Sequence, residues 1–304
     1  MAVINLLSAN FFSMIRSKRF WLGTFIMAAG GVYMVLDINR MKDMAEFDGL
    51  LDSGVFQYAI LLFLILPALG SLFINTDYND GTIRNKLTVG RTRTQVYLSN
   101  LITVYAAGVF YTLVYEAVYL LVGFPVLGSL RHPQAALSKL LMMLLLFLAL
   151  SALFTLLATL ITNRSVLLIC VFMAFGLILG AQIINAKLEA PEMIEDYGGV
   201  TYITTEDGNM TVQYMDKNGN PIDPEDIPRV PNPRYVAEPM RTVLRKVNDI
   251  QPGGQLAELL EDGHLEPDGF KTATPYWQLA LYAAGLAAAV TAGGLIFFRR
   301  KDLK

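Results

Sequence analysis

Long apolar runs alternate with polar connectors along most of this chain. Runs of about 20 mainly apolar residues, the length that a helix needs to cross a bilayer, occur at residues 20–36, 55–74, 101–123, 137–161, 166–184 and 276–298. The runs are continuous and do not alternate between apolar and polar residues, which argues against the strands of a membrane barrel. The pattern therefore predicts an all-α polytopic membrane protein with six transmembrane helices.

The N-terminal stretch AVINLLSANFFSMIR has an amphipathic pattern. Its apolar positions recur at three- and four-residue spacing, while several polar positions, including Arg16, fall toward the other side. We interpret it as a helix that lies in the membrane interface ahead of the first crossing. The alternative is a soluble helix that packs on a partner.

The connector at residues 76–100 is polar and partly basic, although apolar runs lie on both sides of it. Within it, Thr82 is suited to be the N-cap of a short helix that Gly90 ends, so a helix is expected at residues 82–89. A second helix begins near Thr92 and continues into the third apolar run. The connector is therefore predicted to be ordered.

The short helix is itself amphipathic. Ile83 and Leu87 lie four residues apart and share one face, whereas Arg84, Asn85 and Lys86 point elsewhere. Such a helix is suited to insert into a groove on another protein. The alternative is a basic loop that only enforces topology and touches anionic lipid headgroups.

Residues 187–275, between the fifth and sixth runs, differ in composition from the rest. They hold 17 acidic and 8 basic residues. Strand-forming runs on either side of residues 207–209, followed by a turn at Asn218-Gly219, predict a hairpin, and two later stretches predict short helices, the second closed by Gly263. We expect a small mixed α/β extracellular domain here, between residues 1–186 with the first five spans and residues 276–304 with the last.

Charge supports the membrane assignment and predicts its orientation. Only 16% of the residues are charged, against roughly 25% in soluble domains. Basic residues, which collect on the cytoplasmic side of short loops, gather at Arg16, Lys18, Arg19, Arg84, Lys86, Arg91, Arg93, Arg164, Arg299, Arg300, Lys301 and Lys304. With six spans these positions share one side, so both termini are predicted to be cytoplasmic. The opposing loops fit less cleanly: Arg40 and Lys42 are offset by several nearby acidic residues, although these count for little in this rule, and Arg131 and Lys139 are mild exceptions.

Glu116 is the only carboxylate in the middle of an apolar run. Charged groups are costly in the bilayer, so such a residue is a candidate for substrate contact or gating. Tyr115 and Tyr119 belong to an aromatic stripe beside it, and Thr112 and Tyr119 share its face and are candidates to hydrogen-bond to it. The alternative is a structural carboxylic acid that stays neutral.

The connector also resembles a known family. The stretches DYNDGTIRNKL and VYLSNL are similar to the connector after the second span in type-2 ABC export permeases, the membrane subunits of bacterial ATP-driven exporters. The N-terminal "elbow" helix, the six spans and the terminal FFRRKDLK are also similar. So is the stretch NPRYVAEPMRTVLRKVNDIQPGGQLAEL, which resembles the extracellular segment of the Gram-positive branch.

The resemblance implies a coupling helix near residues 82–89 that seats in a cleft of a separate ATPase subunit. The residues in contact would be Thr82, Ile83, Arg84, Asn85, Lys86 and Leu87. It further implies a second permease subunit, identical or related, in a bacterial cell membrane, without a nucleic-acid partner. ATP and Mg²⁺ would bind to the ATPase subunit, with no cofactor in this chain, and the exported substrate would be peptide-like, amphipathic or lipid.

Motifs of other functional classes are missing from the sequence. No phosphate-binding loop GxxxxGK[ST] occurs, since no glycine is followed by lysine, so ATP hydrolysis must come from a partner. No zinc spacing surrounds His132 or His264, and the single cysteine, Cys170, cannot form an internal disulfide. We therefore expect no catalytic or metal site. An intramembrane enzyme and a ligand sensor or scaffold that signals through a cytoplasmic partner remain as alternatives.

Overall fold

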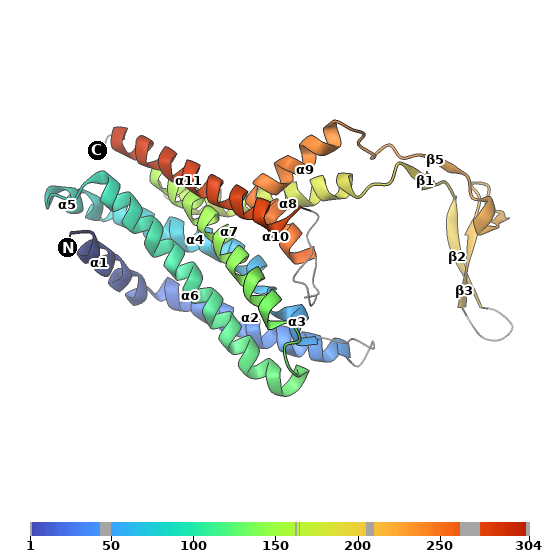
Figure 1. Cartoon of the computed structure of the whole chain (residues 1–304), viewed down its shortest axis with the longest axis horizontal. Helices are drawn as coiled ribbons and strands as arrows, with labels where there is room; N and C mark the ends of the chain where they lie inside the picture. The colour runs from blue at the N-terminus through green and yellow to red at the C-terminus, as the bar shows by residue number, and fades with distance from the viewer. Residues whose placement is uncertain are drawn as a thin grey trace. The chain divides into compact units, whose positions relative to one another are not determined.

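The computed structural model describes residues 2–42, 50–161, 163, 165–204, 210–261 and 274–301 (Figure 1). Its α-helices are α1 (Ala2–Arg16), α2 (Lys18–Lys42), α3 (Leu50–Gly54), α4 (Tyr58–Asn79), α5 (Thr82–Thr88), α6 (Arg93–Leu127), α7 (Pro133–Leu160), α8 (Val166–Leu188), α9 (Met240–Ile250), α10 (Pro252–Glu261) and α11 (Tyr276–Arg300). Among the described residues, six segments are long and apolar enough to span a membrane: α2, α3 with α4, α6, α7, α8 and α11. The predicted fold class is confirmed.

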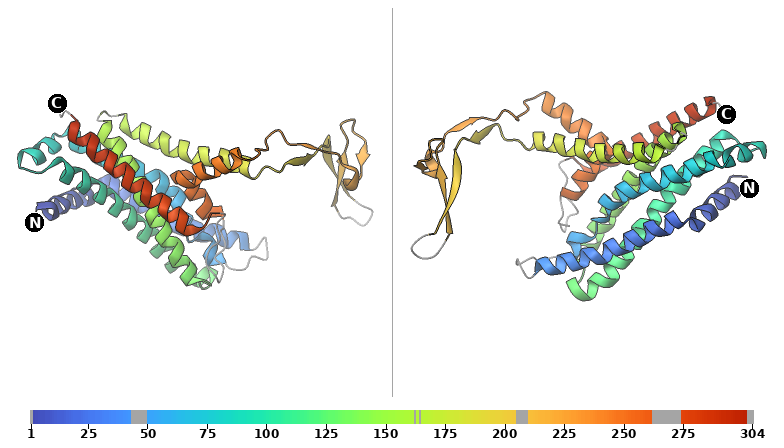
Figure 2. Two further views of the ribbon diagram at one scale, coloured as in Figure 1. Left: turned by 45° about the horizontal axis from the view of Figure 1, so that its top comes forward. Right: turned by 180° about the vertical axis from the view of Figure 1, so that it is seen from behind.

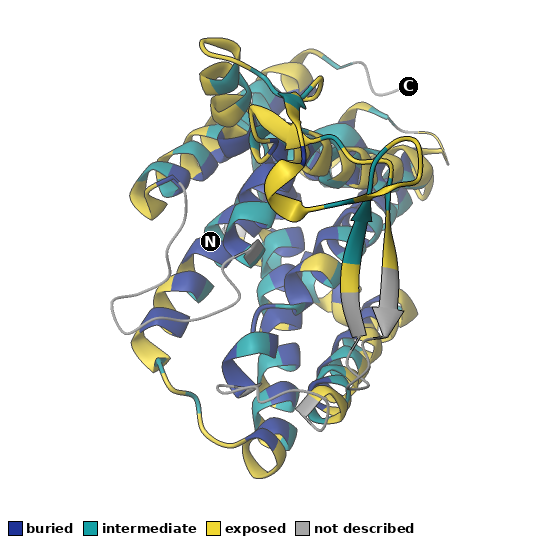
Figure 3. Cartoon of the chain, turned by 90° about the vertical axis from the view of Figure 1, so that its right-hand side faces the viewer, coloured by how far each residue is buried: buried dark blue, intermediate teal, exposed yellow. Residues whose placement is uncertain are grey.

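The chain divides into two compact units, Met1–Gln182 with Asn248–Lys304, and Ile183–Val247. In the larger unit, α7 packs against α4, α6, α10 and α11, and α2 packs against α6. Tyr58 of α4 lies between Tyr115 of α6 and Phe147 of α7, with ring centroids 5.3 and 6.2 Å away. These helices need no alternation of apolar and polar faces, because lipid covers the outward apolar side chains. In Figure 3 the buried residues lie on the helices.

The smaller unit contains two antiparallel sheets. Strand β1 (Met193–Glu195) pairs with β5 (Arg229–Pro231), and β2 (Gly199–Thr204), β3 (Met210–Met215) and β4 (Pro221–Ile222) form the second sheet. A 3₁₀ turn, η1 (Pro224–Asp226), follows β4. The predicted hairpin strands are confirmed, whereas the turn expected at residues 207–209 lies outside the described residues.

The turn after β3 shows why this sequence reverses direction. Gly219 has a positive φ of 83°, and the Asp216 carboxylate accepts backbone N–H bonds from Asn218 and Asn220 at 2.8 Å each. The bonds from Asn220, followed by those from Asn218, lower the pKa of Asp216, because they stabilise its charged form. The predicted turn at Asn218-Gly219 is thus built by local hydrogen bonds.

The region of the predicted extracellular domain is divided between the two compact units. Of residues 187–275, helix α10 belongs to the larger unit, where Leu256 and Leu259 lie in the core with 3% and 1% exposure, and the predicted bounds of the domain stay a prediction. The predicted end of this helix at Gly263 lies outside the described residues. The hairpin and α10 therefore belong to different compact units, although they are close in sequence.

Lys139, an exception to the charge rule, is 2% exposed within α7. Its Nζ lies 5.1 Å from the centroid of the Phe56 ring, in the apolar turn between α3 and α4. A cation over an aromatic face is stabilised by the ring quadrupole. Lys139 is therefore packed inside the helical bundle. Its charge does not belong to a loop of the kind that orients spans in the membrane.

Candidate functional site

Helix α5 is held between two turns that require glycine. Gly81 is the N-cap, with φ of 68° and no side-chain cap, and Gly90 has φ of 85°. The N–H of Gly90 donates to Leu87 O at 2.9 Å, and the N–H of Arg91 donates to Lys86 O at 3.1 Å. These two bonds form a Schellman motif, so the predicted stop at Gly90 is confirmed. Thr82, predicted as the N-cap, is instead the first helical residue.

The two faces of α5 lie in different environments. Ile83 is 2% exposed and lies in a small core with Leu6, Val96, Tyr97 and Phe298, against which Leu87 packs. The apolar face therefore stabilises α5 on its own chain, and the predicted insertion of this helix into another protein stays a prediction. The exposed residues are Arg84, Asn85, Thr88, Val89 and Gly90.

Lys86 connects α5 to the neighbouring helices. Its Nζ lies 2.5 Å from an Asp77 carboxylate oxygen on α4 and 2.9 Å from Asn10 Oδ1 on α1. The Asn10 amide in turn donates to Ser99 Oγ at 3.2 Å and to Asn100 Oδ1 at 3.0 Å, both on α6. We call these five residues the Lys86 network.

The Lys86 network is almost completely shielded from solvent. The side chains of Lys86 and Asp77 are 13% and 12% exposed, and Asn10 and Asn100 are 2% and 3% exposed as residues. Buried polar groups are stable only when they are paired, so the network fixes α5 relative to three helices. The sequence pattern did not identify Asn10 or Asp77, because nothing local marks their pairing.

Basic residues near α5 also close the ends of two other helices. The Arg93 guanidinium donates to the carbonyls of Phe298 and Arg299 at 3.0 Å each and to that of Lys301, at the end of α11. The Lys301 ammonium donates to the carbonyls of Thr159 and Leu160 at the end of α7. Cations stabilise helix C-termini, where carbonyls lack partners. Burial lowers the pKa of Lys301.

Helix α6 begins at this end with its own cap. Thr92 Oγ1 accepts from the N–H of Gln95 at 3.2 Å, and Gln95 Oε1 accepts from the N–H of Thr92 at 3.1 Å, which is a complete capping box. The start predicted near Thr92 is confirmed. Together, α5 and the C-terminal end of α11 lie at the same end of the bundle (Figures 1 and 2).

The tyrosine stripe of α6 bonds to backbone groups of other helices. The hydroxyls of Tyr115 and Tyr119 donate to the carbonyls of Gly54 at 3.0 Å and Leu51 at 2.7 Å, both in α3. The Tyr111 hydroxyl donates to Phe20 O at 2.9 Å. The structure therefore gives Tyr115 and Tyr119 a clear role in positioning α3, and their predicted part in substrate contact or gating stays a prediction.

Glu116 differs from the tyrosines on either side of it. Within the described residues its Oε1 is buried without a hydrogen-bond partner, as are Thr112 Oγ1 on the same face and Tyr58 Oη on α4. The Tyr119 hydroxyl, which was expected to bond to Glu116, donates to α3, and the Thr112 hydroxyl forms no bond to Glu116 within the described residues. Of the predicted candidates Glu116, Tyr115 and Tyr119, Glu116 is therefore the one with a buried oxygen that has no hydrogen-bond partner.

Tyr119→Phe is expected to lower the free energy of unfolding by about 1 kcal/mol, because the buried Leu51 carbonyl loses this donor. Thermal unfolding in detergent measures the change. Tyr33→Phe is the matched control, since Tyr33 is 65% exposed. An equal loss of stability in both variants would contradict the assigned role of the Tyr119 hydroxyl.

The remaining chemistry-bearing residues do not gather into a site in the part of the chain that the structure describes. No group of three or more His, Cys, Asp and Glu side chains there is placed to hold a metal ion. Cys170 is buried in α8, and His264 lies outside the described residues. The candidate functional site is therefore the exposed face of α5 together with the Lys86 network that supports it.

Two comparisons with known proteins bear on this arrangement. Residues 6–180 match the family described as ABC-2 family transporter protein, a range that begins in α1 and includes α5 and the Lys86 network. The comparison with the curated proteins found no match.

Proposed function

The chain belongs to the ABC-2 family of transporter proteins, and we propose that its α5 is the coupling helix on which a separate ATPase subunit acts to move a peptide-like, amphipathic or lipid substrate outward. Membership in the family makes the chain a multi-pass membrane permease subunit with an ABC ATPase as partner. ATP and Mg²⁺ would bind to that ATPase. The direction of transport, the substrate class and the contact residues belong to the proposal.

The observation that carries the proposal is the exposed face of α5 on a rigid support. Val89 is 76% exposed, and Arg84 and Asn85 are exposed beside it. Lys86 and Ile83 hold the opposite face against α1, α4, α6 and α11. A push on Arg84, Asn85 or Val89 would therefore move several helices together, as a transport cycle requires. Thr82 and Leu87 would contact the ATPase subunit at the edge of the interface. Ile83 would act only indirectly, by holding α5 in place.

The proposed orientation places α5 in the cytoplasm. Arg84, Arg91 and Arg93 lie at this end of the bundle with Arg299 and Lys301, as expected for a cytoplasmic surface. Both termini would then be cytoplasmic in a bacterial cell membrane. Arg164, which contributed to the charge pattern, lies outside the described residues.

An accessibility experiment tests the proposal. In a Cys170→Ala background, which lacks other cysteines, Val89→Cys is expected to react with a membrane-impermeant maleimide only in inverted vesicles. The purified ATPase subunit should block this reaction. Lys217→Cys, a position with 68% side-chain exposure in the smaller unit, should react only from the opposite side.

Labelling of Val89→Cys from the outside, or labelling that the ATPase subunit does not change, would disprove the coupling role of α5. Reconstituted vesicles then separate transport from sensing. ATP-dependent flux of a substrate supports the permease, whereas ligand-stimulated ATP hydrolysis without flux would favour the sensor or scaffold.

We also propose that a second permease subunit, the same or a related chain, packs on α8. The helix exposes many large apolar side chains, including Phe172 at 71% and Leu179 at 60%. On the same helix, Gly176 and Gly180 form a small-xxx-small pair, and apart from their own helix backbone and neighbouring residues no described atom lies within 4 Å of where a Cβ would be. Such pairs let two membrane helices approach closely.

Gly176→Leu with Gly180→Leu is expected to shift the purified complex from two permease subunits to one, because leucine side chains prevent the close helix contact. Native mass spectrometry in detergent counts the subunits. Gly285→Leu, an equally open position on α11, should keep the pair. A pair that persists in the double variant would place the interface elsewhere.

The proposed substrate path includes Glu116. Its unpaired, buried Oε1 supplies hydrogen-bonding capacity on α6. Unpaired polar atoms inside a membrane protein suit a transient contact with a polar group of the substrate. Tyr115 and Tyr119 would act there by holding α3 in place.

A further inference from the structure

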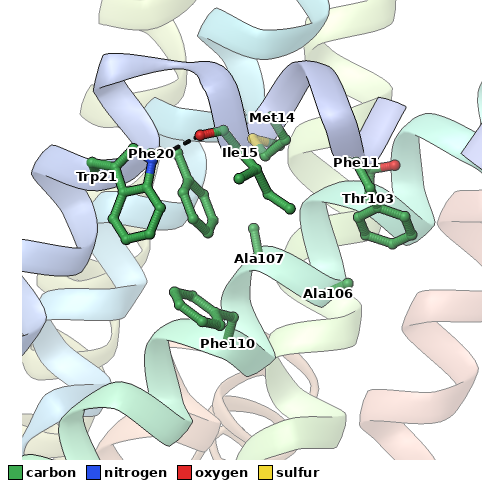
Figure 4. Close-up of a pocket in the computed structure, with 9 residues that line it drawn as sticks. All are labelled: Phe11, Met14, Ile15, Phe20, Trp21, Thr103, Ala106, Ala107 and Phe110. Atoms are coloured by element: carbon green, nitrogen blue, oxygen red, sulfur yellow. Dashed lines mark hydrogen bonds between the residues drawn. The ribbon is translucent and has the colours of Figure 1, made fainter. Parts of the chain in front are cut away.

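An apolar pocket of about 280 Å³ lies between the α1–α2 junction and α6 (Figure 4). It is lined by Phe11, Met14, Ile15, Phe20, Trp21, Thr103, Ala106, Ala107 and Phe110. Thr103 contributes a hydroxyl, which already donates to Ser99 O at 2.7 Å. Ala106 and Ala107 leave room opposite Ile15, because their side chains are short. The pocket therefore suits an apolar guest that needs no hydrogen bonds.

Trp21 stands at the opening of this pocket. Its indole Nε1 donates to Ile15 O at 2.7 Å, shown as the dashed line in Figure 4, which fixes the ring beside the space. Trp21 and Ile15 are 54% and 50% exposed, so the pocket is open to the surroundings of the bundle. For a membrane-spanning chain those surroundings are the lipid near the interface.

The junction between α1 and α2 carries positive charge next to the pocket. Arg16, Lys18 and Arg19 fall within four residues of each other, directly between the pocket residues Ile15 and Phe20. The Arg19 guanidinium donates to Thr76, and the Arg16 guanidinium lies 5.2 Å from the centroid of the Phe12 ring. Arg16 and Lys18 are exposed, and within the described residues neither forms an ion pair.

We propose that this pocket binds one acyl chain of an anionic phospholipid of the cytoplasmic leaflet, with the headgroup phosphate at Arg16 and Lys18. The inference rests on the orientation in the proposed function. An apolar space next to cations matches the two parts of such a lipid, an acyl chain and a negative headgroup. The lipid would fill the gap between the elbow helix and α6, two of the helices that the Lys86 network joins.

The two tryptophans of the chain, Trp21 and Trp277, allow a direct test without ATPase or transport. In Trp277→Phe, Trp21 is the only tryptophan, and brominated acyl chains that enter the pocket quench its fluorescence. The full-length chain is reconstituted in vesicles with the same total content of phosphatidylglycerol and phosphatidylcholine, and either one or the other is brominated. We expect the site to prefer phosphatidylglycerol about tenfold, since each nearby cation attracts anionic lipid.

Three variants identify the source of the quenching. Arg16→Gln with Lys18→Gln, both at exposed positions, should remove the preference for phosphatidylglycerol and leave some quenching by both lipids. Ala106→Phe fills the pocket and should reduce quenching by either lipid. Trp21→Phe, which leaves Trp277 as the reporter, should show no preference between the two lipids.

Equal quenching of Trp21 by the two brominated lipids in Trp277→Phe overturns the proposed headgroup site. Absence of quenching by either lipid overturns the acyl-chain site and indicates another occupant, such as a second copy of the chain. Neither result bears on whether the ATPase subunit protects Val89→Cys, so failure of this inference is distinguishable from failure of the proposed function.

Discussion

Lys86→Ala is expected to reduce ATP-driven transport by about tenfold or more, which corresponds to about 1.4 kcal/mol of lost coupling, while the ATPase subunit still hydrolyses ATP. Without Lys86, the Asp77 carboxylate loses its partner at 2.5 Å, and Asn10 loses the donor to its side-chain oxygen. Removing one partner of a buried ion pair costs about 3–5 kcal/mol, and this pair, 12–13% exposed, belongs near the lower end.

A second variant separates the effect on folding from the effect on coupling. In Lys86→Met with Asp77→Leu, both charges are replaced by apolar groups, so most of the lost stability should return. If the ion pair transmits movement from α5 to α4, transport should stay low in this double variant. Lys187→Ala, which removes an exposed lysine, is the control for a general effect of charge.

Measurements of stability, ATP hydrolysis and flux on the same preparations decide the outcome. Thermal unfolding reports stability, and the ratio of substrate moved to ATP hydrolysed reports coupling. Wild-type flux in Lys86→Ala would show that the Lys86 network does not transmit force. Full flux in the stable double variant would show that the network only holds α5 in its fold.

Gly253→Ala is expected to lower the free energy of unfolding by about 2–3 kcal/mol, the upper part of the range for overpacking. A Cβ at this position would lie 2.1 Å from the carbonyl oxygen and 2.5 Å from the carbonyl carbon of Leu177 on α8. Both are backbone atoms, so α10 and α8 must separate. Leu256 and Leu259, which α10 buries in the core, would lose contacts.

Gly285→Ala is the matched control for this substitution. It also places an alanine in a helix, but apart from the helix's own backbone and neighbouring residues no described atom lies within 4 Å of the new Cβ. Alanine favours the helix by up to about 1 kcal/mol over glycine, so this variant should be as stable as the wild type or more stable. Thermal unfolding of both variants in one detergent tests the difference. Equal unfolding temperatures would mean that α10 is not packed on α8 as described.

Much of the fold could be predicted because it depends on local properties. The six spans follow from the length and apolarity of each run, which need no knowledge of neighbouring helices. The end of α5 at Gly90 and the start of α6 at Thr92 follow from residues within three or four positions of each boundary. The predicted start of α5 was less accurate, since Gly81 is the N-cap, a position that the sequence pattern assigned to Thr82.

The environment of each side chain could not be predicted in the same way. The pattern showed that Ile83 and Leu87 share a face, but it did not show that this face packs on Leu6, Tyr97 and Phe298. The sequence likewise placed Tyr119 next to Glu116, whereas its hydroxyl bonds to α3. An amphipathic pattern identifies which residues share a face, and only the neighbours determine what covers that face.

The sequence by itself determined that this chain is a six-span membrane protein with an ordered, helical connector between its second and third spans, because hydropathy and capping act over a few residues. The tertiary structure alone decided which side of α5 is free and which residues support it. Asn10 bonds to Lys86 across 76 positions and to Asn100 across 90. Such contacts form only when the packing of apolar helices brings distant segments together, and no local pattern encodes that pairing.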